Sequence, residues 1–305
     1  MTPKRKHKST LGRTHCRRQS RQHSARLRAY VRPGVATLIV ASILLAPSAF
    51  GWGDNADRLI VNSAVATLPD EIRPFFEANR QFFVLHVTDP NDAAKQSPSE
   101  LHNQFIRLDH YGQYPFANLP REYKTASRKF SRRSLDANGL LPWQIGLYSA
   151  KLTDDFRTAN WASAKLDAAL LASYVADAHD PFNTTVNNDG HLSGQIGVND
   201  RFGKGLVNRY SLFFYLHPNP AAFISDPTDH AFEMCLTAHS WLENVLLADR
   251  RSYEGLSDYN DAYYDRFYSE AGAVLVRQVS DAATDVGSYW LTAWENAGRP
   301  SLPAQ

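Results

Sequence analysis

The sequence predicts an all-α protein, a single-domain multi-helix bundle. Apolar residues recur every three to four positions in several long segments, as on the buried face of an amphipathic helix. No alternating apolar–polar run of useful length indicates a β-strand, and no internal repeat is visible. Proline or glycine interrupts the periodic segments where helices would end. The chain beyond residue 51 is long enough to bury one full core.

The periodic segments follow one another along residues 52–305. The first ends before Pro69, and the second begins at Asp70 with an acidic first turn in which Pro74 is tolerated. Between 88 and 100 the sequence is polar with two prolines, which predicts a loop. The expected helical segments are 56–68, 70–87, 119–133, 140–156, 160–180, 201–214, 227–252 and 263–298. The segment 160–180 has the strongest helical pattern, because it is rich in Ala, Leu and Lys and ends at Pro181.

The first 51 residues differ from the rest and are predicted to be a basic leader and signal peptide. Residues 1–34 contain eleven Lys or Arg and no acid, and 35–46 are an apolar run too short to span a bilayer as a helix. Ala49 and Gly51 occupy the −3 and −1 positions of a cleavage site, so cleavage would leave Trp52 as the N-terminus. We expect export to the periplasm or the extracellular space. Two alternatives are a retained anchor and a basic nucleic-acid arm, and the latter leaves the apolar run unexplained.

Removal of the leader changes the charge of the protein. The whole chain carries +2, whereas residues 52–305 hold 22 basic and 31 acidic residues, a net charge of −9. Such a body is not expected to offer a basic nucleic-acid groove. Cys235 is then the remaining cysteine, so no internal disulfide is expected. Oligomeric state is left open.

Several stretches of residues 52–305 resemble the zinc-dependent phospholipase C family, whose fold is shared with single-strand-specific zinc nucleases. The matching stretches are WGDNADRLIVNSAVATLP, HVTDPND, FIRLDHYGQYPFANLPREY, GLLPWQIGLY, YVADAHDPFNTT, DGHLSGQIGVNDRF and SYWLTAWENAGRPSLP. The resemblance implies a helical bundle of the phospholipase C type. It also implies zinc-dependent phosphoester hydrolysis, with three zinc ions bound by nine protein ligands.

Carried over to this chain, the resemblance retains three ligand positions and replaces six. Trp52 would provide its α-amine and carbonyl oxygen, Asp89 a carboxylate, and Asp177 a carboxylate that bridges two metals. The replaced positions are Asp57, Gln104, Ser173, Asn183, Asn199 and Gly203. Most of these positions hold histidine in the family. Because zinc prefers imidazole and thiolate ligands, the sequence predicts that zinc binding is lost or weak.

Two functions follow from this pattern, and both are carried as hypotheses. The first is an exported phospholipase C/nuclease-like scaffold that is inactive or strongly impaired, with a phospholipid or nucleotide-like ligand in its vestigial cleft. The second is a phosphodiesterase or phosphomonoesterase acting on lipid or nucleotide phosphoesters. It would use one Ca²⁺, Mg²⁺ or Mn²⁺ ion near Trp52, Asp57, Asp89 and Asp177, with Asp89 as the candidate catalytic residue, because hard cations favour oxygen ligands.

Histidines elsewhere in the chain are an alternative source of metal ligands. His179, His102 and His191 are the nearest in sequence to the replaced positions, but hydrogen-bonded structural or surface roles are the simpler interpretation. The Tyr- and Trp-rich segment 259–296 is compatible with a lipid-facing groove, although helical spacing favours ordinary core packing.

Overall fold

The computed structural model describes residues 52–303, which lie within one of two units of the chain, Leu45–Gln305. The regular elements of these residues are helices, and no strand occurs among them, so the predicted all-α multi-helix bundle is confirmed. The proposed leader and its cleavage site after Gly51 lie outside the described residues. Within the described part of the chain, no helix combines the length and the apolar character that crossing a membrane requires.

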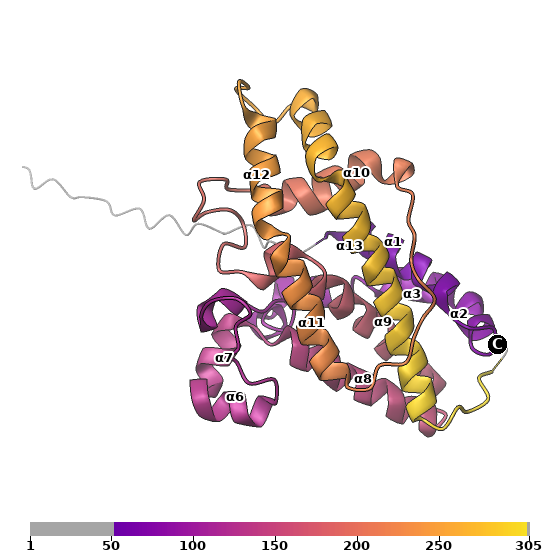
Figure 1. Cartoon of the computed structure of the whole chain (residues 1–305). Helices are drawn as coiled ribbons and strands as arrows, with labels where there is room; N and C mark the ends of the chain where they lie inside the picture. The colour runs from indigo at the N-terminus through magenta and orange to yellow at the C-terminus, as the bar shows by residue number, and fades with distance from the viewer. Residues whose placement is uncertain (1–51, 304–305) are drawn as a thin grey trace, which may run out of the picture. The chain divides into compact units, whose positions relative to one another are not determined.

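Figure 1 shows how the helices are arranged. The α-helices are α1 (Asp54–Ala64), α2 (Arg73–Ala78), α3 (Arg80–His86), α4 (Asp89–Gln96), α5 (Pro98–Leu101), α6 (Tyr123–Phe130), α7 (Arg132–Asn138), α8 (Leu141–Arg157), α9 (Trp161–Ala178), α10 (Val207–Tyr210), α11 (Pro227–Ser240), α12 (Leu242–Tyr253) and α13 (Asp261–Asn296). Shorter helical turns are η1 (Val65–Thr67), η2 (Leu108–Tyr111), η3 (Pro181–Thr184), η4 (Asp200–Leu206, a π-helix) and η5 (Ser211–Phe213).

Helix boundaries differ from the prediction in several places, and the expected helix 119–133 is divided into α6 and α7 at Ser131. The expected helix 70–87 is divided into α2 and α3 at Asn79, whose side chain donates to the carbonyl of Phe75. The prediction of a loop over 88–100 is wrong, because α4 and α5 occupy it; each begins with a proline in its first turn, where no backbone donor is needed. The expected segment 227–252 is divided into α11 and α12 at Trp241.

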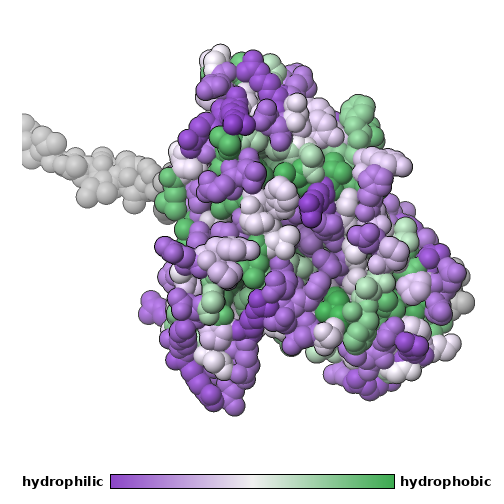
Figure 2. Space-filling view, in the orientation of Figure 1, coloured by the Kyte–Doolittle hydropathy of each residue, from purple (hydrophilic) through white to green (hydrophobic). Residues whose placement is uncertain are grey.

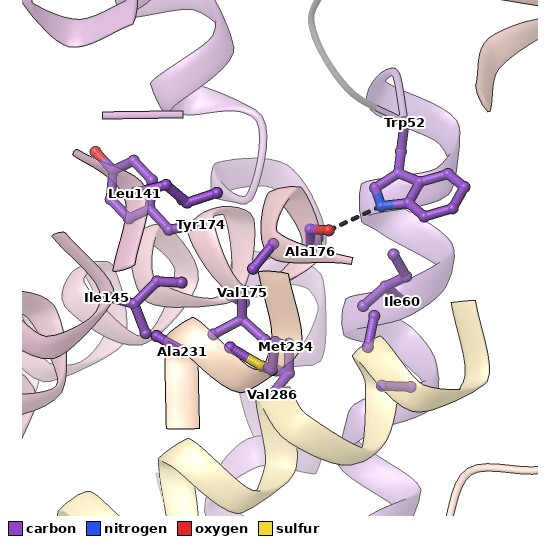
Figure 3. Packing of buried hydrophobic residues seen from close by; sticks show 14 of the residues in the cluster. Trp52, Ile60, Leu141, Ile145, Tyr174, Val175, Ala176, Ala231, Met234 and Val286 are labelled. Atoms are coloured by element: carbon purple, nitrogen blue, oxygen red, sulfur yellow. Dashed lines mark hydrogen bonds between the residues drawn. The ribbon is translucent and has the colours of Figure 1, made fainter. Parts of the chain in front are cut away.

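The core forms around α8, α9 and α13, with α1 packed against α9 and α13. Helix α9 is buried on nearly all sides, in agreement with its strongly apolar sequence. Trp290 of α13 stacks on Phe76 with ring centroids 4.4 Å apart, and its indole donates to the carbonyl of Ala168 in α9 at 3.0 Å. Figure 3 shows part of this apolar cluster, in which residues of α1, α8, α9, α11 and α13 meet. Cys235 is buried in it, and burial raises the pKa of its thiol.

The turn η1 and the end of α1 approach α13 closely at a glycine. A Cβ atom on Gly287 of α13 would lie 2.0 Å from Oγ1 of Thr67, so no larger residue fits without movement. Thr67 is held in this position because its hydroxyl donates to the carbonyl of Ala64 at 2.7 Å.

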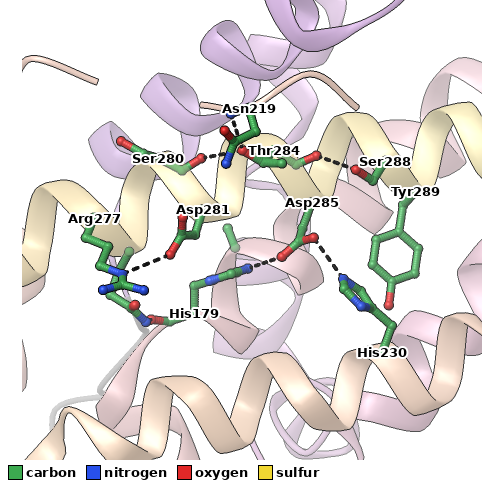
Figure 4. Close-up of polar contacts among 12 residues, drawn as sticks. His179, Asn219, His230, Arg277, Ser280, Asp281, Thr284, Asp285, Ser288 and Tyr289 are labelled. Carbon is green, nitrogen blue, oxygen red and sulfur yellow. Dashed lines mark hydrogen bonds and ion pairs between the residues drawn. The ribbon is translucent and has the colours of Figure 1, made fainter. Parts of the chain in front are cut away.

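An extended segment, residues 217–224, runs along α13 and is tied to it by hydroxyl groups. The backbone N–H groups of His217, Asn219, Ala222 and Ile224 donate to Ser280, Thr284, Ser288 and Thr292 respectively, at 2.8–3.2 Å. These four acceptors are spaced four residues apart and therefore follow one face of the helix. Figure 4 shows three of them in a row. The segment is thus fixed along its length without forming a sheet.

Candidate functional site: a buried carboxylate and amide cluster

The C-terminal half of α9 contributes two of the expected site residues. Ser173 and Asp177 are one helical turn apart, so they share a face, and both are buried. Asn183, in the turn η3 that follows, donates Nδ2 to the Asp177 backbone carbonyl and to its Oδ1, both at 3.1 Å. Asp180 starts this turn by accepting from the backbone N–H of Phe182 at 2.8 Å. Because the helix ends before Pro181, the chain turns back and the side chain of Asn183 contacts the last turn of α9.

Asp57 and Gln104 reach each other through a third residue. Asn91 of α4 donates Nδ2 to Oδ2 of Asp57 in α1 at 3.0 Å. Its Oδ1 accepts from Nε2 of Gln104 at 3.3 Å. All three side chains are buried. The structure thus joins two of the predicted positions through Asn91, a residue that the sequence interpretation did not include.

Asp89 is placed differently from the other acidic positions. Its side chain is 45% exposed, and Oδ2 contacts Nδ1 of His86 at 2.7 Å. Residues 89 and 91 of one helix are separated by about 200° around its axis, so they project from nearly opposite sides. Asn91 contacts Asp57 and Gln104; no hydrogen bond or ion pair of the described residues joins Asp89 to either. The short motif DPND contains both Asp89 and Asn91, and the sequence interpretation selected Asp89 alone.

Trp52 is packed beside α9 rather than exposed at the chain end. Its indole donates to the carbonyl of Ala176 at 2.8 Å, the residue before Asp177 (Figure 3). Its ring packs on Phe202 of η4, with centroids 5.9 Å apart, and Phe202 packs on Phe182 of η3 at 6.1 Å. The indole thereby ties the start of the described chain to the helix that carries Asp177.

The remaining positions, Asn199 and Gly203, lie at and within η4 and are buried. Neither the oxygen nor the nitrogen of the Asn199 side chain has a hydrogen-bond partner. At the end of α9 and the turn after it, three further buried oxygens are unpartnered, namely Ser173 Oγ, Asp177 Oδ2 and Asp180 Oδ2. Unpaired buried polar atoms are costly, so each of these atoms is a position at which a proton, a water molecule or a cation would be stabilising.

The acids of the cluster are shifted strongly toward their neutral forms. Burial raises the pKa of Asp57 to about 7, despite the hydrogen bond from Asn91. Burial, together with the charges of Asp57 and Asp180, also raises the pKa of Asp177 well above its usual range. Burial raises the pKa of Asp180 to about 7. Asp180 was not among the expected site residues; its position beside the buried Asp177 only becomes apparent from the fold.

The residues present do not fit a zinc site of the expected kind. In residues 52–303 no group of three or more His, Cys, Asp or Glu side chains is arranged to hold a metal ion. The cluster around Asp57 and Asp177 offers carboxylate, amide and hydroxyl groups and no imidazole. Zinc binds such neutral oxygen donors poorly. We therefore derive no chemistry through zinc for this chain.

His179, two residues after Asp177, does not pair with the acids of the buried cluster but with Asp285. Its Nε2 contacts Oδ2 of Asp285 in α13 at 2.9 Å, and Nε2 of His230 contacts the other carboxylate oxygen at 2.8 Å. Figure 4 shows Asp285 between the two rings. Although burial alone would raise the pKa of Asp285, the hydrogen bonds from His179 and His230 lower it to about 2. This arrangement links α9, α11 and α13 and gives His179 a structural role.

A separate hollow of about 610 Å³ lies between α8 and the start of α11 and contains none of the cluster residues. Trp143, Leu140 and Leu147 form its apolar wall, and Arg121 and Asp229 stand at its rim. Arg121 is already paired with Asp229 and Glu233, at 2.5 Å each. The hollow is consequently a mainly apolar groove whose one cation is neutralised.

Comparison with known proteins adds no relative to these observations: no protein-family model matches the chain, and no curated protein matches it.

Proposed function

We propose that this chain is an exported helical scaffold of the zinc-dependent phospholipase C/nuclease type whose phosphoester hydrolysis is lost or strongly impaired. The observation that supports it most directly is the mutual pairing of the cluster residues. Asn91 bonds Asp57, Gln104 bonds Asn91, and Asn183 bonds Asp177. Four of the expected metal-ligand positions, Asp57, Gln104, Asp177 and Asn183, are thus hydrogen-bonded to an amide or a carboxylate of the protein itself.

The chemistry of these pairs argues against hydrolysis. A metal-dependent phosphoesterase needs a cation that polarises the phosphoryl group and generates hydroxide near neutral pH. Here amide N–H groups occupy part of the space in which a metal would contact the carboxylates. Burial also favours the protonated form of Asp57 and Asp177, and a protonated carboxyl is a poor ligand. The cluster is therefore better suited to holding helices together than to activating water.

Metal analysis combined with an activity assay tests this function. The purified protein is expected to retain far less than one zinc per chain after dialysis and to leave a chromogenic phosphodiester uncleaved. Addition of a chelator should not change the circular dichroism or the melting temperature of the protein. Three tightly bound zinc ions, or hydrolysis abolished by a chelator and restored by zinc, would refute the proposal.

A single hard cation is the second candidate, and the unpartnered oxygens favour it. Ser173 Oγ, Asp177 Oδ2 and Asn199 Oδ1 are the donor types that Ca²⁺ and Mg²⁺ prefer. In this case Ca²⁺, Mg²⁺ or Mn²⁺ should raise the melting temperature of the protein, and Asp177→Asn should remove that increase. The same experiment tests for a ligand in the vestigial cleft. Phosphocholine or a nucleoside monophosphate should raise the melting temperature if either binds there.

A further inference from the structure

The most exposed large apolar side chains of the described residues belong to one short segment. Leu212 is 95% exposed, Phe213 75% and Tyr215 76%. They lie in and directly after η5, and we call these three residues the apolar tip. In Figure 2, hydrophobic side chains protrude at the upper right of the molecule, where Figure 1 places α10 and the turn that follows it. Isolated exposed apolar residues are ordinary, but adjacent large ones with this exposure indicate an interaction surface.

The tip is held outward by the residues on either side of it. Before the tip, Tyr210 stacks on Tyr268 of α13 with centroids 4.3 Å apart, and its hydroxyl donates to Asp265 at 2.6 Å. Between the tip residues, the ring of Phe214 stacks on the same Tyr268. After the tip, His217 is the first of the backbone donors that tie 217–224 to α13. The apolar side chains are therefore presented on a fixed support and are not able to fold back onto the core without breaking these contacts.

The size of the tip favours a lipid surface over a protein partner. A stable protein–protein interface buries about 800 Å² on each partner, contributed by some 20–30 residues. Three neighbouring side chains at a protruding turn fall well short of that area. Insertion into the outer part of a bilayer needs only such a small group, and Leu, Phe and Tyr are suited to that region.

Cationic groups are placed beside the tip as a membrane surface requires. A hollow of about 440 Å³ is lined by Arg58, Arg80 and Leu212, and Arg80 is paired with Glu77 at 2.6 Å. Arg58 has its acidic neighbour Asp54 only at 3.9 Å. Arg209, which precedes the tip, lies over the ring of Tyr264 at 3.8 Å and has Asp261 only at 3.5 Å, so the edge of its guanidinium carries no close carboxylate. Both are surface pairs of the kind that contribute little, so these guanidinium groups are available to lipid phosphates.

From these contacts we infer that the apolar tip docks the protein on a phospholipid bilayer, with Leu212, Phe213 and Tyr215 entering the interface and Arg58 and Arg209 facing the phosphates. The inference rests on the exposed tip and its support, and it stands whether or not the buried cluster hydrolyses phosphoesters.

Vesicle binding tests the docking surface. The full-length protein is mixed with vesicles of phosphatidylethanolamine and phosphatidylglycerol, and its binding is compared with that of the variant Leu212→Ser/Phe213→Ser/Tyr215→Ser. The triple variant should bind at least about 10-fold more weakly, since each large apolar side chain contributes to partitioning. The matched control is Leu147→Ser/Ile196→Ser, which removes apolar side chains of 54% and 69% exposure elsewhere and should bind as the unaltered protein does. Equal binding by the triple variant would overturn the inference.

A site-specific probe separates tip insertion from any contribution of residues 1–51. An environment-sensitive dye is attached to Leu212→Cys in a Cys16→Ser background, since Cys235 is buried. Vesicles should shift its emission to shorter wavelength, while the same dye on Leu147→Cys should not respond. An unchanged emission at position 212 would overturn the inference. So would a shift that grows with protein concentration in the absence of vesicles, because the tip would then bind a second copy of the chain.

Discussion

The side-chain amide of Asn183 donates to both the backbone carbonyl and the carboxylate of Asp177, at 3.1 Å each. One amide therefore connects η3 to the end of α9 at a position where the resembled family uses an imidazole. The amide donates to the carboxylate directly, whereas an imidazole that binds a metal turns its unprotonated nitrogen to the cation. A second hydrogen bond from an amide to a buried carboxylate joins Asn91 to Asp57.

Restoring zinc binding should depend on Asn91 rather than on Asp89. Two variants are compared that share six substitutions and differ only at residue 91. The variant with Asn91→Asp should bind zinc at least about 10-fold more tightly than the variant that keeps Asn91, because loss of a group that contacts the metal lowers affinity more than loss of a group that only orients a ligand. The shared background is Asp57→His, Gln104→His, Ser173→His, Asn183→His, Asn199→His and Gly203→Glu. Zinc content after dialysis measures the difference. Equal zinc in the two variants would assign the ligand role to Asp89.

Asp57 should make the protein less stable as pH rises. Its pKa is about 7 in the folded state and near 3.8 when unfolded, so between these values the native state binds more protons and the free energy of unfolding falls with increasing pH. Asp177 and Asp180 contribute a slope of the same sign, so Asp57→Asn should reduce the slope rather than abolish it. The variant should be more stable than the unaltered protein at pH 8, by at most about 4 kcal/mol. Urea unfolding at several pH values measures it. Asp54→Asn, in the exposed first turn, is the control, and a slope unchanged in Asp57→Asn would contradict the prediction.

Asp285, unlike Asp57, should make the protein more stable as the pH rises from about 2 to 4. Its pKa is lowered to about 2 by its two histidine partners, so its stabilisation is complete above about pH 4 and is lost as the pH falls toward 2. Asp285→Asn should cost about 2 kcal/mol at neutral pH. The control is Asp281→Asn, whose partner Arg277 is exposed and 3.4 Å away, and which should cost less than about 1 kcal/mol. Similar losses in both variants would show that the histidine pair adds nothing specific.

The contact between Gly287 and Thr67 should couple two substitutions. Gly287→Ala alone should destabilise the protein by about 1–3 kcal/mol, because the new methyl group meets the Thr67 hydroxyl. Combining it with Thr67→Ala should recover part of that loss, so the two effects should not add. Thermal unfolding of the single and double variants gives the coupling. Strict additivity would mean that the helices separate rather than clash at this point.

Periodicity in the sequence was sufficient for the helical class and for α8, α9 and α13, because long amphipathic or apolar segments have few alternatives to helix. It failed over 88–100, where polar composition predicted a loop and the structure has α4 and α5. It also joined α2 with α3, since their common spacing continues across Asn79. These errors concern short helices, whose stability comes from packing more than from local preference.

The sequence by itself determined that the chain is a helical bundle and that four of the six replaced positions carry an amide or a hydroxyl group. Only the tertiary structure decided that Asn91 meets Asp57 while Asp89 meets His86, that Asp180 joins the buried acids, and that Leu212 is left in solvent. The physical reason is that ligand type is a property of each residue. The partner of a side chain, and the burial that shifts its pKa, depend on helices brought together from distant parts of the chain.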